Sequence, residues 1–163
     1  MGRAFVLGDD INTDVLAPGR WMRLPPEGLA AHCLEDVVPG FAEAVRPGDF
    51  VVAGRNFGMG SSREQAAVSL KVLGISAILA TSFARIFFRN AINLGLPALM
   101  YPAAGSIRDG DELFVDLVAG RVENITQGTV ELVTPLPPHL MEMVEEGGLL
   151  AHLKARFAGQ VSA

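Results

Sequence analysis

Residues 50–101 alternate between two hydrophobic patterns, and this alternation limits the folds open to the chain. Three short apolar runs have the length of buried strands: 50–53, 77–80 and 96–101. Between these runs, apolar residues recur at helical spacing over 65–73 and 83–94, and a glycine follows each helical segment. An order of strand, helix, strand, helix, strand predicts parallel pairing with right-handed crossovers.

The pattern changes in the C-terminal third. Three short segments alternate apolar and polar residues between glycine-containing turns: 112–118, 121–125 and 129–133. They predict an antiparallel meander. A helix is expected from Thr134-Pro-Leu-Pro to Glu146, then a final amphipathic helix and a frayed tail at 159–163. The sequence therefore predicts one α/β domain over 1–163, with a short, partly parallel central sheet, flanking helices and a small antiparallel meander.

The N-terminal part is less regular. Residues 4–7 are a strand candidate, and the polar segment 8–14 follows them. This segment lacks the alternating acids, the glycine and the distal Glu of an EF-hand. An Asx-turn loop and a functional loop both remain open interpretations. Short helices are expected at 27–35 and 41–45.

The segment 17–26 combines prolines and a glycine with the only tryptophan of the chain. The prolines and the glycine argue against regular structure there. A loop that exposes Trp21, Arg20 and Arg23 is a candidate for contact with a ligand or a partner. The alternative is that Trp21 anchors a surface loop.

Composition excludes several classes of protein. The formal net charge of −5 argues against binding to nucleic acid, which favours a basic face. The single cysteine, Cys33, rules out an internal disulfide and a cluster or zinc site ligated by this chain alone, and the three histidines show no metal spacing. Early acidic residues exclude a signal peptide, and no apolar run reaches the ~18 residues of a membrane span. A soluble, cytoplasmic protein is expected.

A glycine-rich turn at 54–64 joins the first strand of the alternating segment to its first helix. It has no Lys before its hydroxyls, so it is not a Walker loop. Arg63 replaces the last glycine of a dinucleotide fingerprint. The order Gly60-Ser-Ser-Arg-Glu also differs from the Gly-x-Ser-x-Gly of a hydrolase elbow.

Two interpretations of this turn remain open, and they are compatible. Ser61-x-x-Glu64 and Ser62-x-x-Gln65 both match a capping box, so one or both serines are expected to cap the helix. Unpaired backbone N–H groups at a helix start also attract anions. There, a serine can act as a base if N–H groups and Arg63 stabilise its alkoxide, or Arg63 can bind a carboxylate in a fork.

Three ordered segments resemble the small subunits of 3-isopropylmalate dehydratase, the swivelling domain of the aconitase superfamily: 8–14, 56–65 and 82–97. The resemblance continues through 134–137 and 146–149 and so covers nearly the whole chain. It implies a hydro-lyase of leucine biosynthesis that isomerises 2-isopropylmalate and 3-isopropylmalate by dehydration and rehydration. It also implies a large partner subunit that holds a [4Fe–4S] cluster, which the small subunit closes over. Alone, the chain is expected to be inactive.

The resemblance also implies roles for residues. Ser61 would be the base that removes a proton from carbon, Ser62 would donate a hydrogen bond, and Arg63 would bind a substrate carboxylate. Thr13 and Asp14, at the edge of the site, and Arg23, in the following segment, would also bind the substrate.

The segment around Arg23 falls where relatives carry a specificity loop, but Trp21, Met22 and Leu24 depart from the common string. Met59 also replaces a cysteine that many relatives have, but no loss of chemistry is expected from this change, whereas the altered loop leaves the substrate open. The alternatives are therefore a homoaconitase or methylmalate-type small subunit, or a regulatory binding module without catalysis.

Overall fold

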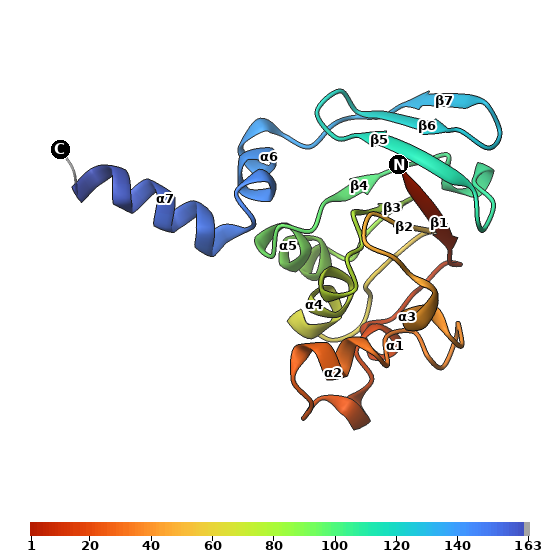
Figure 1. The fold of residues 1–163 in the computed structure, drawn as a ribbon, viewed down its shortest axis with the longest axis horizontal. Coiled ribbons are helices and arrows are strands. Elements are labelled where there is room, and N and C mark those ends of the chain that lie inside the picture. Colours follow the sequence, from red (N-terminus) through yellow and green to blue (C-terminus); the bar gives the residue numbers. More distant parts are fainter. Residues whose placement is uncertain (162–163) are drawn as a thin grey trace.

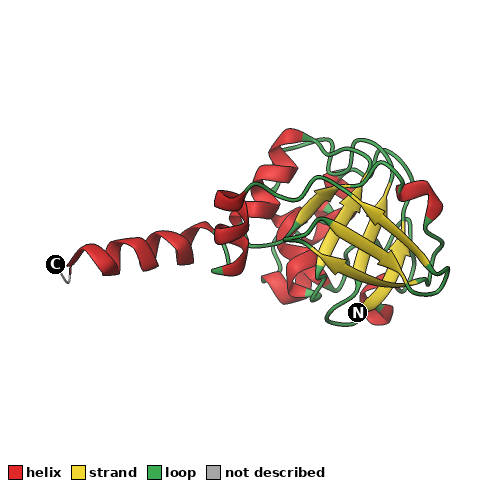
Figure 2. Cartoon of the chain, turned by 90° about the horizontal axis from the view of Figure 1, so that it is seen from above, coloured by secondary structure: helices red, strands yellow, loops and turns green. Residues whose placement is uncertain are grey.

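A computed structural model describes residues 1–161 of the chain, and within that range the strands form one seven-stranded sheet in the order β4-β3-β2-β1-β5-β6-β7 (Figures 1 and 2). The strands are β1 (Gly2–Val6), β2 (Phe50–Ala53), β3 (Ala77–Ala80), β4 (Ala98–Met100), β5 (Glu112–Asp116), β6 (Arg121–Asn124) and β7 (Thr129–Leu132). The α-helices are α1 (Thr13–Leu16), α2 (Pro26–Ala30), α3 (Phe41–Ala44), α4 (Glu64–Val72), α5 (Arg85–Asn93), α6 (Pro138–Glu145) and α7 (Leu149–Val161). Two 3-10 helices, η1 (Gly19–Trp21) and η2 (Ala104–Ser106), lie in connections.

The sheet has a parallel half and an antiparallel half, as the sequence predicts. Strands β1 to β4 pair in parallel, whereas β5, β6 and β7 form an antiparallel meander. The halves join where β1 pairs antiparallel with β5. The predicted strands at 50–53 and 77–80 are confirmed to the residue, and α4 and α5 confirm the two crossover helices.

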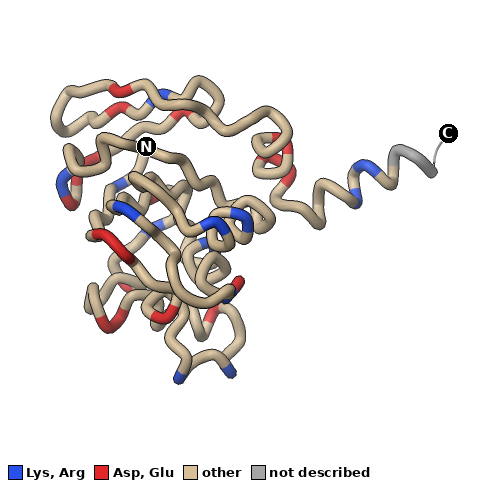
Figure 3. The backbone as a smooth tube through the Cα atoms, turned by 180° about the vertical axis from the view of Figure 1, so that it is seen from behind, with Lys and Arg blue, Asp and Glu red and all other residues tan. Residues whose placement is uncertain are grey.

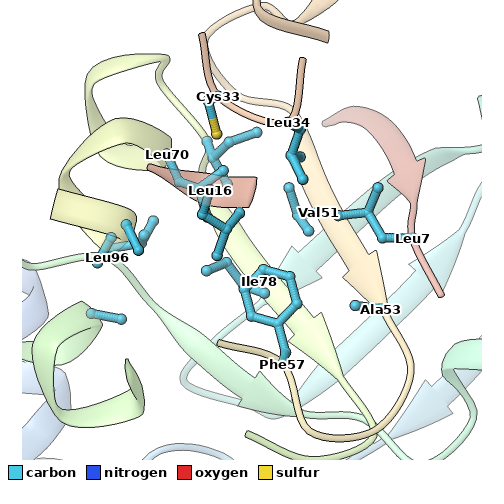
Figure 4. Packing of buried hydrophobic residues seen from close by; sticks show 14 of the residues in the cluster. Leu7, Leu16, Cys33, Leu34, Val51, Ala53, Phe57, Leu70, Ile78 and Leu96 are labelled. Atoms are coloured by element: carbon cyan, nitrogen blue, oxygen red, sulfur yellow. The ribbon is translucent and has the colours of Figure 1, made fainter. Parts of the chain in front are cut away.

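Both faces of the central strands β2 and β3 are buried, which explains why these strands are apolar throughout rather than alternating. Alternate residues contribute to two clusters. On the helix side, strand residues such as Val51 and Ile78 pack with Leu16, Leu70 and Phe57 (Figure 4). On the other side, the core combines strand residues with the meander and α6: Phe50, Val52, Leu79, Leu113, Val122 and Met141.

Helix α7 extends away from the sheet (Figures 1 and 2). Its apolar residues Leu150, Leu153 and Phe157 are exposed. The amphipathic helix predicted here is confirmed, but the predicted frayed tail overlaps it, because α7 continues to Val161. Residues 162–163 of that tail lie outside the described residues.

Two local predictions in the N-terminal part are wrong. The α-helix expected at 27–35 ends at Ala30, because the amides of His32 and Cys33 bond carbonyls three residues back rather than four. Leu34 then has a positive φ of 60°, and its amide donates to the carbonyl oxygen of Val15 (2.8 Å). Regular structure also occurs within 17–26, where Gly19–Trp21 form the 3-10 turn η1.

Another correction concerns the start of α5. The helical pattern begins at Phe83, but the helix begins at Arg85, with Ala84 as its N-cap residue. The Ser82 hydroxyl does not cap the helix and accepts from the Asn56 amide (2.9 Å). Ile86, which the helical spacing predicts on the core face, is exposed.

Candidate active site

Three loops meet at the carboxyl ends of β1, β2 and β3, the edge at which parallel sheets bind ligands. Backbone hydrogen bonds join them. The Gly58 amide donates to the Ile11 carbonyl (2.7 Å), and the Phe57 amide donates to the Ser82 carbonyl (3.0 Å). The Thr13 amide donates to the Met59 carbonyl (2.8 Å). The central turn is therefore held between the loops that follow β1 and β3.

Two glycines allow this close approach. Gly58 has φ 82°, and a Cβ there would lie 2.1 Å from Cγ of Phe87. Gly60 has φ 104°, and a Cβ there would lie 2.9 Å from the Asn12 side-chain oxygen. Only glycine combines this backbone conformation with so little space.

The predicted capping boxes are wrong. Arg63 is the N-cap residue of α4, and the helix has no side-chain cap among the described residues. The turn runs further than the capping pattern assumes, so Ser61 and Ser62 precede the cap and both are exposed. Their hydroxyls therefore remain available for other contacts.

Thr13 is buried directly beneath Ser61. Its hydroxyl oxygen lies 3.2 Å from the Ser61 hydroxyl oxygen and 3.3 Å from the Ser61 carbonyl oxygen. Only 1% of Thr13 is exposed, so this residue contacts Ser61 rather than open space. Burial and the hydrogen bond from the Thr13 amide to the Met59 carbonyl therefore hold the Thr13 hydroxyl next to Ser61, the predicted base.

Arg63 reaches from the turn to α1. Its guanidinium forms an ion pair with Asp14 and donates from Nη1 to the carbonyl oxygen of Ala17 (3.2 Å). The Asp14 side chain is mostly exposed, whereas the Arg63 side chain is only about one-third exposed. The structure thus brings Thr13, Asp14, Ser61 and Arg63 together, and Arg63 holds a carboxylate of its own chain.

The segment 17–26 is anchored through its tryptophan. The Trp21 ring stacks on the His32 ring at 4.0 Å between centroids, and its Nε1 donates to Glu35 (2.7 Å). The Arg20 guanidinium donates two hydrogen bonds to the Asp36 carboxylate and also forms an ion pair with Glu35. Hydrogen bonds from His32, Trp21 and Arg20 lower the pKa of the Glu35 carboxyl to about 2. The anchoring interpretation of Trp21 is supported.

Arg23 lies further along this segment and is exposed. It makes no hydrogen bond or ion pair with any residue of the described range 1–161. The structure does not bring it into contact with Ser61.

A cavity of about 620 Å³ lies beside Ser61. Its lining consists of Gly58, Gly60, Ser61, Ala84, Arg85, Ile86 and Arg89. The two arginines come from the first turns of α5 and were not predicted as site residues. A spacing of four residues between them, on a helix that follows the third strand, is the sequence pattern that could have indicated them.

Within residues 1–161, no group of three or more His, Cys, Asp and Glu side chains could hold a metal ion. Cys33 is buried, and burial raises the pKa of its thiol, so it packs as an apolar residue. None of the described helices is long and apolar enough to cross a membrane. Basic and acidic positions are interspersed along the chain (Figure 3).

Residues 36–104, which contain the central turn, match the family model of the aconitase C-terminal domain. The fold is similar to the crystal structure of a 3-isopropylmalate dehydratase from Methanocaldococcus jannaschii. The TM-score is 0.94 and the identity 40%, over 99% of this chain and 96% of that one. A 3-isopropylmalate dehydratase small subunit from Archaeoglobus fulgidus is 53% identical over 157 residues, which is 94% of each chain. The chain belongs to this family of small subunits. The predicted family and fold are confirmed.

A second member of the family carries a different name. The methanogen homoaconitase small subunit of Methanothermobacter thermautotrophicus is 49% identical, over 93% of this chain and 88% of its own. Since the two identities are close, likeness alone does not separate the two activities for this chain.

Proposed function

We propose that this chain is the small subunit of a hydro-lyase that interconverts 2-isopropylmalate and 3-isopropylmalate in leucine biosynthesis, together with a large subunit. The observation that carries the proposal is the contact between the hydroxyls of Thr13 and Ser61, which are 3.2 Å apart, with Ser61 at the wall of the cavity. Family membership and the length of the match to named small subunits support it.

Ser61 is assigned as the base. Its hydroxyl must be held as an alkoxide to take a proton from carbon, and this needs a donor already in place. The Thr13 hydroxyl, 3.2 Å away, can donate to that oxygen. We therefore assign Thr13 as a positioning residue and oxyanion donor, in place of the substrate contact predicted from the sequence.

Substrate carboxylates are assigned to the polar groups around Ser61. Ser62 is exposed next to it and supplies a hydrogen-bond donor. Arg63 offers a fork for one carboxylate and now holds Asp14, so substrate binding exchanges one carboxylate partner for another. Asp14 then remains at the edge of the site, and Arg23 is left to contact the substituent that distinguishes the acids.

The reaction also requires a group that this chain does not hold. A [4Fe–4S] cluster on the large subunit would supply the Lewis acid that activates the leaving hydroxyl. The small subunit closes over that centre and is expected to be inactive alone. The partners are thus a large subunit and a 2-hydroxy acid in the cytoplasm, with no role for nucleic acid or membrane.

The test is Ser61→Ala in the reconstituted pair. Turnover of 3-isopropylmalate is expected to fall by ~10³-fold or more, with the affinity for the large subunit unchanged, because the base is lost and the turn is not. Ser106→Ala, at an exposed serine of η2, is the matched control and is expected to keep full turnover. Near-normal turnover of Ser61→Ala would overturn the assignment of the base.

The second candidate is a homoaconitase-type activity, favoured by the exposed Arg23, which suits an additional carboxylate, and by the relative of that name. The reconstituted wild-type pair should be assayed against isopropylmalate, homocitrate-derived acids and methylmalates. Preference for the acid with the extra carboxylate, lost in Arg23→Gln, would favour homoaconitase. Binding of a cluster protein without any turnover would favour a regulatory module.

A further inference from the structure

Two arginines on α5 share the cavity of the proposed base. Arg85 and Arg89 line it together with Ser61, and no acidic side chain belongs to the lining. Both arginines are exposed. Neither makes an ion pair or a side-chain hydrogen bond within the part of the chain that the structure describes. Arg63, by contrast, has two partners outside this cavity.

The positions of these arginines are unfavourable for the helix that carries them. Arg85 is the first residue of α5, where the partial positive charge of the helix start disfavours a cation. Arg89 lies one turn later, so two like charges face the same side at a spacing that costs ~0.2–0.5 kcal/mol in an isolated helix. Helix stability therefore does not explain them, and such a local conflict is typical of a functional site.

An anion in the cavity would resolve both conflicts. Guanidinium groups bind carboxylates through paired N–H donors, and two of them on one wall match a dianionic acid better than a neutral one. Ile86, which lies between the two arginines in the sequence, is exposed and adds an apolar side chain to the lining of the cavity. A volume of about 620 Å³ is within the usual ~300–1,000 Å³ of small-molecule sites.

We propose that Arg85 and Arg89 form a second carboxylate clamp, which binds a substrate carboxylate opposite Arg63 and orients the acid over Ser61. The clamp rests on the proposed function of this site. It makes α5, and not only the turn before α4, part of substrate recognition. No proton transfer is assigned to either arginine.

The test compares two double variants in the pair reconstituted at saturating large subunit. In Arg85→Gln/Arg89→Gln, the KM for 3-isopropylmalate is expected to rise by about tenfold or more while kcat changes by less than about threefold, because the clamp binds the ground state and the transition state alike. Arg85→Lys/Arg89→Lys keeps the charge without the fork and should give an intermediate KM. The control, Arg108→Gln/Arg156→Gln, removes two exposed positive charges elsewhere and should leave the KM unchanged.

A direct binding measurement separates this proposal from the assignment of the base. In the Ser61→Ala background, calorimetry should show the Kd for 3-isopropylmalate raised by about the same factor when both arginines are replaced by Gln. An unchanged KM and Kd would overturn the clamp. So would a loss confined to affinity for the large subunit, which would make these arginines partner contacts. Failure of the proposed function would appear separately, as absence of turnover in the wild-type pair.

Discussion

The two halves of the sheet differ in where the loops between their strands lie. In the parallel half, β1, β2 and β3 all end at one edge, so the three loops that follow them converge and are joined by backbone hydrogen bonds. In the antiparallel half, consecutive strands are joined by short turns at alternate ends, so no edge gathers three loops. The same chain therefore places its candidate site in the first half and uses the second mainly to cover a face of the sheet.

Polar groups differ between the halves in the same way. In the antiparallel half, Asp111 is buried, and hydrogen bonds from Asn124, the Arg108 amide and Gln127 lower its pKa. Such a satisfied group stabilises local structure. In the parallel half, Ser62 and the two arginines of α5 face open space. Polar groups that the described fold does not use are the ones available to a substrate.

The largest contrast is expected between two glycines. Gly58→Ala should destabilise the protein by about 3 kcal/mol or more, because the new Cβ would overlap Phe87 and the residue would keep a positive φ. Gly128→Ala, in the turn between β6 and β7, also has a positive φ but nothing within 4 Å, so about 1–2 kcal/mol is expected. Chemical denaturation measures both. Equal losses would contradict the idea that only the first turn is closely packed.

A smaller contrast concerns two threonines. Thr13→Val keeps the shape of a buried side chain but removes the hydroxyl beside Ser61, so kcat of the reconstituted pair should fall by ~10²-fold. Thr13→Ser should retain most of the activity. Thr129→Val, on the exposed strand β7, should change nothing. Full activity of Thr13→Val would mean that Ser61 needs no donor from α1.

The smallest effect should be visible in acid. The folded-state pKa of Glu35 lies near 2, below its ordinary 4.5, so its contribution to stability is complete above pH 4.5 and is lost as the pH falls through about 2. Fluorescence of Trp21, the only tryptophan, should report release of the 17–26 segment in that window while circular dichroism still shows the folded sheet.

Glu35→Gln supplies the control, since it removes the titrating carboxyl that His32, Trp21 and Arg20 share. Its fluorescence should be independent of pH over the same range. Asp111→Asn, in the antiparallel half, should leave the Trp21 transition in place. A transition that persists in Glu35→Gln would show that another group controls the segment.

Much of the fold could be predicted because its patterns are local. Apolar runs of strand length, helical spacing and glycines after helices predict β2, β3, α4 and α5 from neighbouring residues. The capping boxes at Ser61 and Ser62 failed for the opposite reason. Their geometry depends on where the turn is held, and the hydrogen bonds of Ile11, Thr13 and Ser82 to that turn come from distant parts of the chain.

The sequence by itself determined the alternation of strands and helices, the meander, the family resemblance and the polar residues of the central turn, because each is written in residue type and spacing. Only the tertiary structure decided what those residues touch. It buried Thr13 beneath Ser61, paired Arg63 with Asp14 and turned Arg85 and Arg89 toward the same cavity. These contacts join residues up to 49 positions apart, and such distances close only when parallel strands bring their loops to one edge.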